Sequence, residues 1–205
     1  MPIDAILRLA LLPLLTMPRF LVPLLFTLVL SPAAQANDLG NAAQTVAGIY
    51  GSIWLHELGH AATAKAFGAT DIRIEVPPKG RILSGVTYFT YPRQPTPAER
   101  RAVALSGMIA ANLGAELVLQ NRGLHRNEFA QSILGTSLAS NAIHVYTYYT
   151  KWVGVDGYRG NDIDDYARAG GNPHLMSAAL VGYTAWSLRR MRKKEIPLFY
   201  VNLKF

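Results

Sequence analysis

The chain has 205 residues, enough for one domain with a substantial core. Half of its residues are hydrophobic and 16% are charged, against about a quarter in soluble domains, which favours a membrane environment. It contains no cysteine, so disulfides, thiol nucleophiles and thiolate metal ligands are excluded, and any metal must rest on nitrogen and oxygen ligands.

The excess of positive charge, formally +7, is clustered near the C-terminus in Arg189, Arg190, Arg192, Lys193 and Lys194. Such a short run is typical of the flank of a lipid surface. No basic stripe interleaved with aromatic residues and no nucleic-acid module accompanies it. We therefore expect a lipid bilayer, and not nucleic acid, as the partner of this charge.

The N-terminal 36 residues have the layout of a targeting segment. An apolar run, 20–30, follows Arg19, and 34–36 (A-Q-A) is a small-residue cleavage pattern. We expect 1–36 to be a secretory signal peptide, or a signal anchor if it is not cleaved. The remainder, 37–205, is then one membrane-embedded domain.

Four later segments are long and apolar enough to predict helices: 42–67, 102–119, 129–150 and 174–188. A helix that crosses a bilayer needs about 20 mainly apolar residues. The first three segments approach this length, and the last is short. Gly68 stands where the first of these helices would end.

Between the first two helices the pattern changes to that of a β-hairpin over 71–91. Residues 72–76 (I-R-I-E-V) alternate apolar and charged side chains with period two, and 77–80 (P-P-K-G) have turn chemistry. Residues 81–91 form a second β-rich run. The predicted fold is mainly α, with polytopic membrane helices and one β-hairpin inserted after the first of them.

The most informative stretch is H-E-L-G-H, within the first helix. His56 and His60 are four residues apart, so they stand one turn apart on one face of a helix and can direct two ring nitrogens at one zinc ion. Glu57 is rotated by one residue, so it can reach an attacking water but is poorly placed as a ligand. In H-E-x-x-H zinc hydrolases the two histidines bind the metal in this way, and the glutamate acts as the general base. The alternative is a pair of hydrogen-bonded core histidines, which leaves three ionisable groups in an apolar helix to be explained.

A zinc hydrolase normally has three protein ligands and one open position, so a third ligand must come from elsewhere in the chain. The best cluster is 160–165 (G-N-D-I-D-D), between two apolar helices, which contains Asp162 and Asp165. Asp156 and His144 are weaker candidates. Each member of the cluster could instead belong to a solvated loop or a helix N-cap.

These features together resemble the site-2 protease family of intramembrane zinc metalloproteases. The resemblance consists of H-E-L-G-H in an apolar helix, the hairpin behind it, 106–112 (S-G-M-I-A-A-N) in the next helix, and a late aspartate. It implies that Zn²⁺ is held by His56, His60 and that aspartate, for which Asp162 is the best match. Asp165, three residues further on, is the alternative ligand, and whichever of the two does not bind zinc would orient a histidine ring.

The resemblance also implies hydrolysis of peptide bonds in membrane protein substrates. Glu57 would take a proton from the attacking water and deliver it to the leaving amine. Asn112, Asn141 or His144 would help to stabilise the developing oxyanion, although core packing is the alternative role of the last two. Because a substrate helix must unwind before attack, its extended strand could pair with the edge of 82–91.

Two other functions are compatible with the sequence. One is a zinc-binding membrane protein that does not cleave, and the other is a secreted soluble zinc peptidase released after residue 36. The main prediction is a multi-pass protein, as in a bacterial inner membrane, with lipid and a membrane protein substrate as partners. The sequence predicts no particular oligomeric state.

Overall fold

The computed structural model describes residues 38–79, 81–151 and 160–197. The predicted targeting segment, 1–36, and the alternative ligand Asp156 lie outside these residues. In chain order the elements are α3 (Asp38–Ala66), β1 (Thr70–Glu75), β2 (Val86–Thr90), α4 (Pro97–Gln120), η1 (Arg122–Leu124), α5 (Glu128–Thr150), α6 (Asp162–Arg168) and α7 (Pro173–Lys193).

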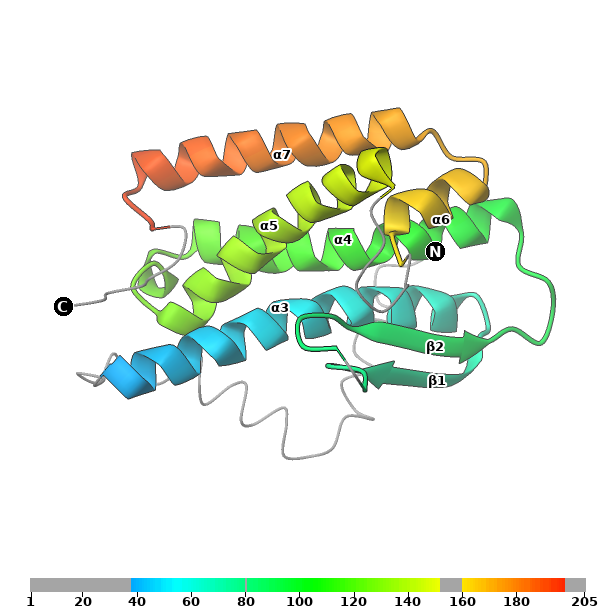
Figure 1. Ribbon diagram of the computed structural model, residues 1–205, viewed down its shortest axis with the longest axis horizontal. Helices are drawn as coiled ribbons and strands as arrows, with labels where there is room; N and C mark the ends of the chain where they lie inside the picture. Colours follow the sequence, from blue (N-terminus) through cyan, green and yellow to red (C-terminus); the bar gives the residue numbers. More distant parts are fainter. Residues whose placement is uncertain (1–37, 80, 152–159, 198–205) are drawn as a thin grey trace, which may run out of the picture.

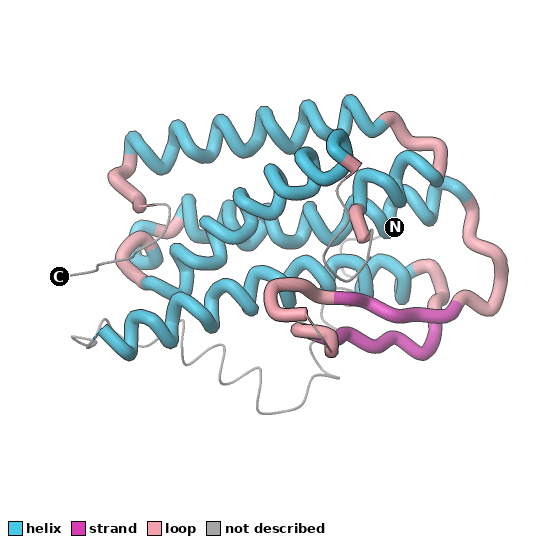
Figure 2. Tube along the Cα trace, viewed as in Figure 1, coloured by secondary structure: helices cyan, strands magenta, loops and turns pink. Residues whose placement is uncertain are grey.

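The four long helices lie side by side as a bundle (Figure 1). α3 packs against both α4 and α5, and α7 packs against α5. The hairpin lies beside the C-terminal half of α3, and the short α6 contacts α4, α5 and α7 (Figure 2). The prediction of a mainly α fold with one hairpin after the histidine-bearing helix is confirmed.

α4 and α7 extend beyond their predicted bounds because their polar end turns are well suited to helix termini, and α3 begins at Asp38, before its predicted start at 42. α4 begins before the predicted 102–119, where Thr96 caps the helix and forms a capping box with Glu99. α7 begins under an Asn172 cap and continues to Lys193, so most of the basic run is helical. Cations are favoured at the C-terminal end of a helix by its dipole.

β1 and β2 pair antiparallel, with Ile74 opposite Thr87. β2 is shorter than the predicted run 81–91, because the residues before Val86 form a loop that lies against α3. In this loop the carbonyl oxygen of Ile82 accepts a hydrogen bond from the hydroxyl of Tyr50 at 2.8 Å. β2 pairs with β1 along one edge, and no other described strand covers its second edge.

Small residues allow α3 to lie very close to its two neighbours. A Cβ added at Gly59 would stand 2.8 Å from Cβ of Ala110 on α4, and one added at Gly48 would stand 2.7 Å from Cβ of Ser132 on α5. Both distances are shorter than real side chains tolerate, so glycine is needed at both crossings. Close contact through small residues is typical of packing between membrane helices.

Among the described residues, one helix is long and apolar enough to cross a membrane, and this helix is α4. Half of its most apolar 18-residue window is buried inside the bundle. The buried core helix of a soluble protein can have the same length and composition. The arrangement of several membrane-spanning helices that the sequence suggests is therefore still a prediction.

Candidate metal centre

α3 carries His56 and His60 on one face, and their Nε2 atoms are 3.1 Å apart. The Nδ1 atom of His60 lies 2.7 Å from the carbonyl oxygen of Val103 on α4. Because a carbonyl oxygen only accepts, Nδ1 of His60 carries a proton, and loss of the proton from Nε2 would leave a lone pair there for a metal. Space beside the two rings is tight, since a Cβ added at Gly107 would stand 2.8 Å from Nε2 of His56.

Asp162 is the first residue of α6, and hydrogen bonds of Asn161 fix where that helix begins. Oδ1 of Asn161 accepts a bond from the N–H of Ile163 at 2.8 Å, which caps the helix. Nδ2 of Asn161 donates to the carbonyl oxygen of His144 at 2.8 Å and to the hydroxyl of Thr147 at 2.6 Å. Since these two residues belong to α5, Asn161 ties the start of α6 to α5 and so positions Asp162.

Three imidazoles surround the carboxylate of Asp162. Its Oδ2 lies 3.0 Å from Nε2 of His56, 3.4 Å from Nε2 of His60 and 4.0 Å from Nε2 of His144. This oxygen is buried, and the described residues give it no well-directed hydrogen bond. Burial alone would raise the pKa of the Asp162 carboxyl, but the charges of His60, His56 and His144 outweigh burial and hold this pKa well below its usual range. The carboxylate is therefore ionised and available as a ligand.

These distances fit a bound metal ion. Zinc binds nitrogen and oxygen at about 2.0–2.2 Å, so the ligand atoms of a regular tetrahedron lie about 3.3–3.6 Å apart. The atoms of His56, His60 and Asp162 are 3.0, 3.1 and 3.4 Å apart. The ligand atoms of His56, His144 and Asp162 lie within 4.8 Å of one another. A group of histidine and aspartate side chains could therefore hold a metal ion here.

Glu57 is buried beside these ligands, with 6% of its surface exposed. Its Oε2 accepts a hydrogen bond from the hydroxyl of Thr87 on β2 at 2.7 Å. A Cβ added at Gly85 would stand 2.8 Å from Oε1 of Glu57, so a residue without a side chain is required where the loop covers the carboxylate. The side chain of Glu57 is thus held between its own helix, α3, and the hairpin.

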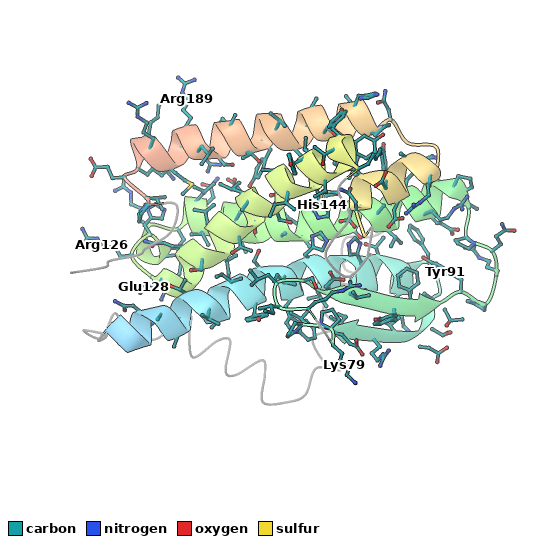
Figure 3. The ribbon with its side chains drawn as sticks, viewed as in Figure 1. Lys79, Tyr91, Arg126, Glu128, His144 and Arg189 are labelled. Carbon is teal, nitrogen blue, oxygen red and sulfur yellow. The ribbon has the colours of Figure 1, made fainter. Side chains whose placement is uncertain are left out.

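A cleft of about 1480 Å³ opens at this group. It is lined by α3, α4 and α5, by the segment 81–87 and by the start of α6. Its volume exceeds the roughly 300–1,000 Å³ of small-molecule pockets, which leaves room for an extended peptide segment. In Figure 3, His144 lies between α5 and α3, consistent with the stacking of its ring on that of His56 at 5.5 Å between centroids.

Other residues considered from the sequence are placed differently. Asp165 is exposed and forms an ion pair with Arg168, so it does not join the ligands. Asn112 and Asn141 hydrogen-bond to each other at 2.9 and 3.2 Å and do not line the cleft. His144, a weaker ligand candidate from the sequence, does lie beside His56 and Asp162. The only feature of the sequence that indicated this position was a polar ring in an otherwise apolar helix.

No protein-family model matches the chain, and no curated protein or solved structure matches it either. The resemblance to site-2 proteases therefore rests on the residues of this chain and on their arrangement. The function has to be inferred from the chemistry that the histidine and aspartate group and Glu57 can perform.

Proposed function

We propose that the chain is an intramembrane zinc metalloprotease of the site-2 protease family. The observation that carries this proposal is the convergence of His56, His60 and Asp162 at ligand spacing beside a buried Glu57. Catalytic zinc has three protein ligands and one open position, whereas structural zinc has four protein ligands. Imidazole ligands favour zinc over Mg²⁺ or Ca²⁺, which prefer oxygen.

Glu57 and His144 would act directly on the reacting groups. When bound, zinc would lower the pKa of a water molecule and polarise the scissile carbonyl. Glu57 accepts a proton from the attacking water and delivers it to the leaving amine. His144 lies beside the ligands, 4.0 Å from Asp162, and its ring N–H can donate to the substrate oxygen as negative charge develops.

The substrate would bind as an extended strand along β2. The second edge of β2 has no partner strand among the described residues, and Thr87 of this strand contacts Glu57. A transmembrane helix hides its carbonyl groups in its own hydrogen bonds, so it must unwind before attack and then needs main-chain partners. The cleft between β2 and α5 has room for such a strand.

We place the bundle in a lipid bilayer as a multi-pass protein. Ile109, Leu113 and Leu117 follow one face of α4, and each is more than half exposed. Further large apolar side chains are exposed on α5 and α7, namely Ile143, Tyr146, Tyr149, Leu175, Val181 and Trp186. Large apolar surface is rare on soluble monomers and is expected of a lipid-facing protein. Carbonate extraction of membranes tests this placement, because a secreted soluble peptidase would be washed out.

Cleavage by the reconstituted protein tests the proposal. The full chain is placed in lipid vesicles with a panel of fluorescently labelled single-span peptides, and cleavage is followed with and without zinc. Glu57→Gln should retain zinc, because the amide has the same shape, but should lose about 10²–10⁴-fold in rate, because it cannot accept the proton. A zinc-loaded wild type that cleaves no peptide, or a Glu57→Gln variant that cleaves normally, would contradict the proposal.

A zinc-binding membrane protein without protease activity is the second candidate, and the position of His144 favours it. If His144 joined His56, His60 and Asp162 as a fourth ligand, the site would be closed to substrate as in structural zinc sites. The absorption spectrum of the Co²⁺-substituted protein separates the two candidates, because it depends on coordination number. The protease proposal predicts the same spectrum for wild type and His144→Ala, and the closed site predicts a change.

A further inference from the structure

Thr87 is the residue through which the hairpin contacts the carboxylate of Glu57. Its Oγ1 lies 2.7 Å from Oε2 of Glu57 and 3.0 Å from the carbonyl oxygen of the same residue. A hydroxyl has one proton to donate, and a charged acceptor makes the stronger bond, so the carboxylate receives it.

The segment that leads into Thr87 is attached to α3 at two points. The carbonyl oxygen of Ile82 accepts a bond from Tyr50 at 2.8 Å, and Thr87 donates to Glu57. Tyr50 and Glu57 are seven residues apart, which places them two turns apart on one face of the helix. Gly85, between the two attachments, lies directly over the Glu57 side chain. The segment 82–87 therefore covers the carboxylate and limits how it can move.

We propose that Thr87 is a positioning residue for Glu57. By occupying Oε2, it directs Oε1 towards the attacking water and keeps the carboxylate in one rotamer. Because Thr87 belongs to β2, a substrate strand that pairs with the second edge of β2 would also hold Thr87 in place. Substrate docking and placement of the base are then coupled through one hydroxyl. This inference rests on the proposed proteolytic function.

Three variants test the role of the hydroxyl. Thr87→Val has nearly the same shape but no donor, and it should lower kcat about 10–100-fold, with KM and zinc content unchanged. Thr87→Ser keeps the donor and should restore most of the rate. Thr70→Val is the matched control, because Thr70 donates to the carboxylate of Asp71 at 3.1 Å on the outer strand, away from Glu57. Equal kcat values for Thr87→Val and Thr70→Val, or failure of serine to restore the rate, would overturn the inference.

A second measurement needs no catalytic activity. Thermal unfolding is compared for Thr87→Val, Glu57→Ala and the double variant, and Thr87→Val should lower Tm more in the wild-type background than in Glu57→Ala. Additive Tm shifts would mean that Thr87 does not interact with Glu57, and would overturn the inference even if the protein cleaves peptides. Coupled shifts in a protein that cleaves nothing would instead overturn the proteolytic function and leave the hydrogen bond intact.

Discussion

Gly107→Ala probes the metal centre from the helix that packs against it. In the interior of a helix this exchange usually stabilises a protein by about 0.5–1 kcal/mol. At Gly107 the added Cβ would stand 2.6 Å from Cε1 of His60 and 2.8 Å from Nε2 of His56, whereas ordinary contact of a Cβ begins at 3.4 Å. To lengthen the 2.8 Å distance to an ordinary contact of 3.4 Å, Nε2 of His56 must move away from the new Cβ by about 0.6 Å. This movement is about three times the 0.2 Å within which a metal–ligand distance is expected to stay.

We therefore expect Gly107→Ala to weaken zinc binding at least about 10–100-fold, the usual effect of disturbing a residue that supports a ligand. Competition with a chromophoric chelator measures the zinc affinity of the purified full chain. Gly182→Ala on α7 is the control, because its added Cβ meets no atom within 4 Å, and it should keep its zinc affinity. Unaltered zinc affinity in Gly107→Ala would refute the reasoning, because it would mean that zinc does not bind where the two rings converge.

Three further outcomes follow from the same geometry. Zinc content should fall for Asp162→Asn much more than for Asp165→Asn, as measured by elemental analysis, because only Asp162 faces the imidazoles; the reverse order would remove Asp162 from the ligand set. Asn161→Ala should lower stability by about 1 kcal/mol in thermal unfolding and weaken zinc binding about 10-fold, because α6 loses its cap and its tie to α5. Lowering the pH should release zinc, because protons compete for the imidazole nitrogens, and dialysis at a series of pH values followed by metal analysis checks this direction.

The parts of the fold that depend on local sequence could be predicted. The four-residue spacing places His56 and His60 on one face wherever a helix forms, and their Nε2 atoms are indeed 3.1 Å apart. Period-two alternation followed by P-P-K-G predicted the hairpin, and the structure confirms its two strands, Thr70–Glu75 and Val86–Thr90, as an antiparallel pair. The sequence predicted that the helix after the hairpin starts at 102, whereas α4 begins at Pro97. The prediction followed apolar residues alone, and so it missed the charged first turn that Thr96 caps.

The tertiary contacts of polar residues could not be predicted in the same way. Asn141 and His144 are three residues apart on α5, and sequence alone gave them similar roles. In the structure Asn141 pairs with Asn112 and His144 faces the ligands, because three residues turn a helix by about 300° and leave the two side chains about 60° apart. The contact of Thr87 with Glu57 was also beyond sequence reasoning, since it depends on how the hairpin folds back on the helix.

The location of a bound zinc ion is the most direct test of the central claim. Crystals of the full chain grown with zinc, with diffraction measured on both sides of the zinc absorption edge, would locate the ion by its anomalous signal. We predict one ion per chain, bound by Nε2 of His56, Nε2 of His60 and Oδ2 of Asp162 at about 2.0–2.2 Å, with a fourth position open to the cleft. An ion bound without His60, an ion with His144 as a fourth ligand, or no ion between these side chains would contradict the account.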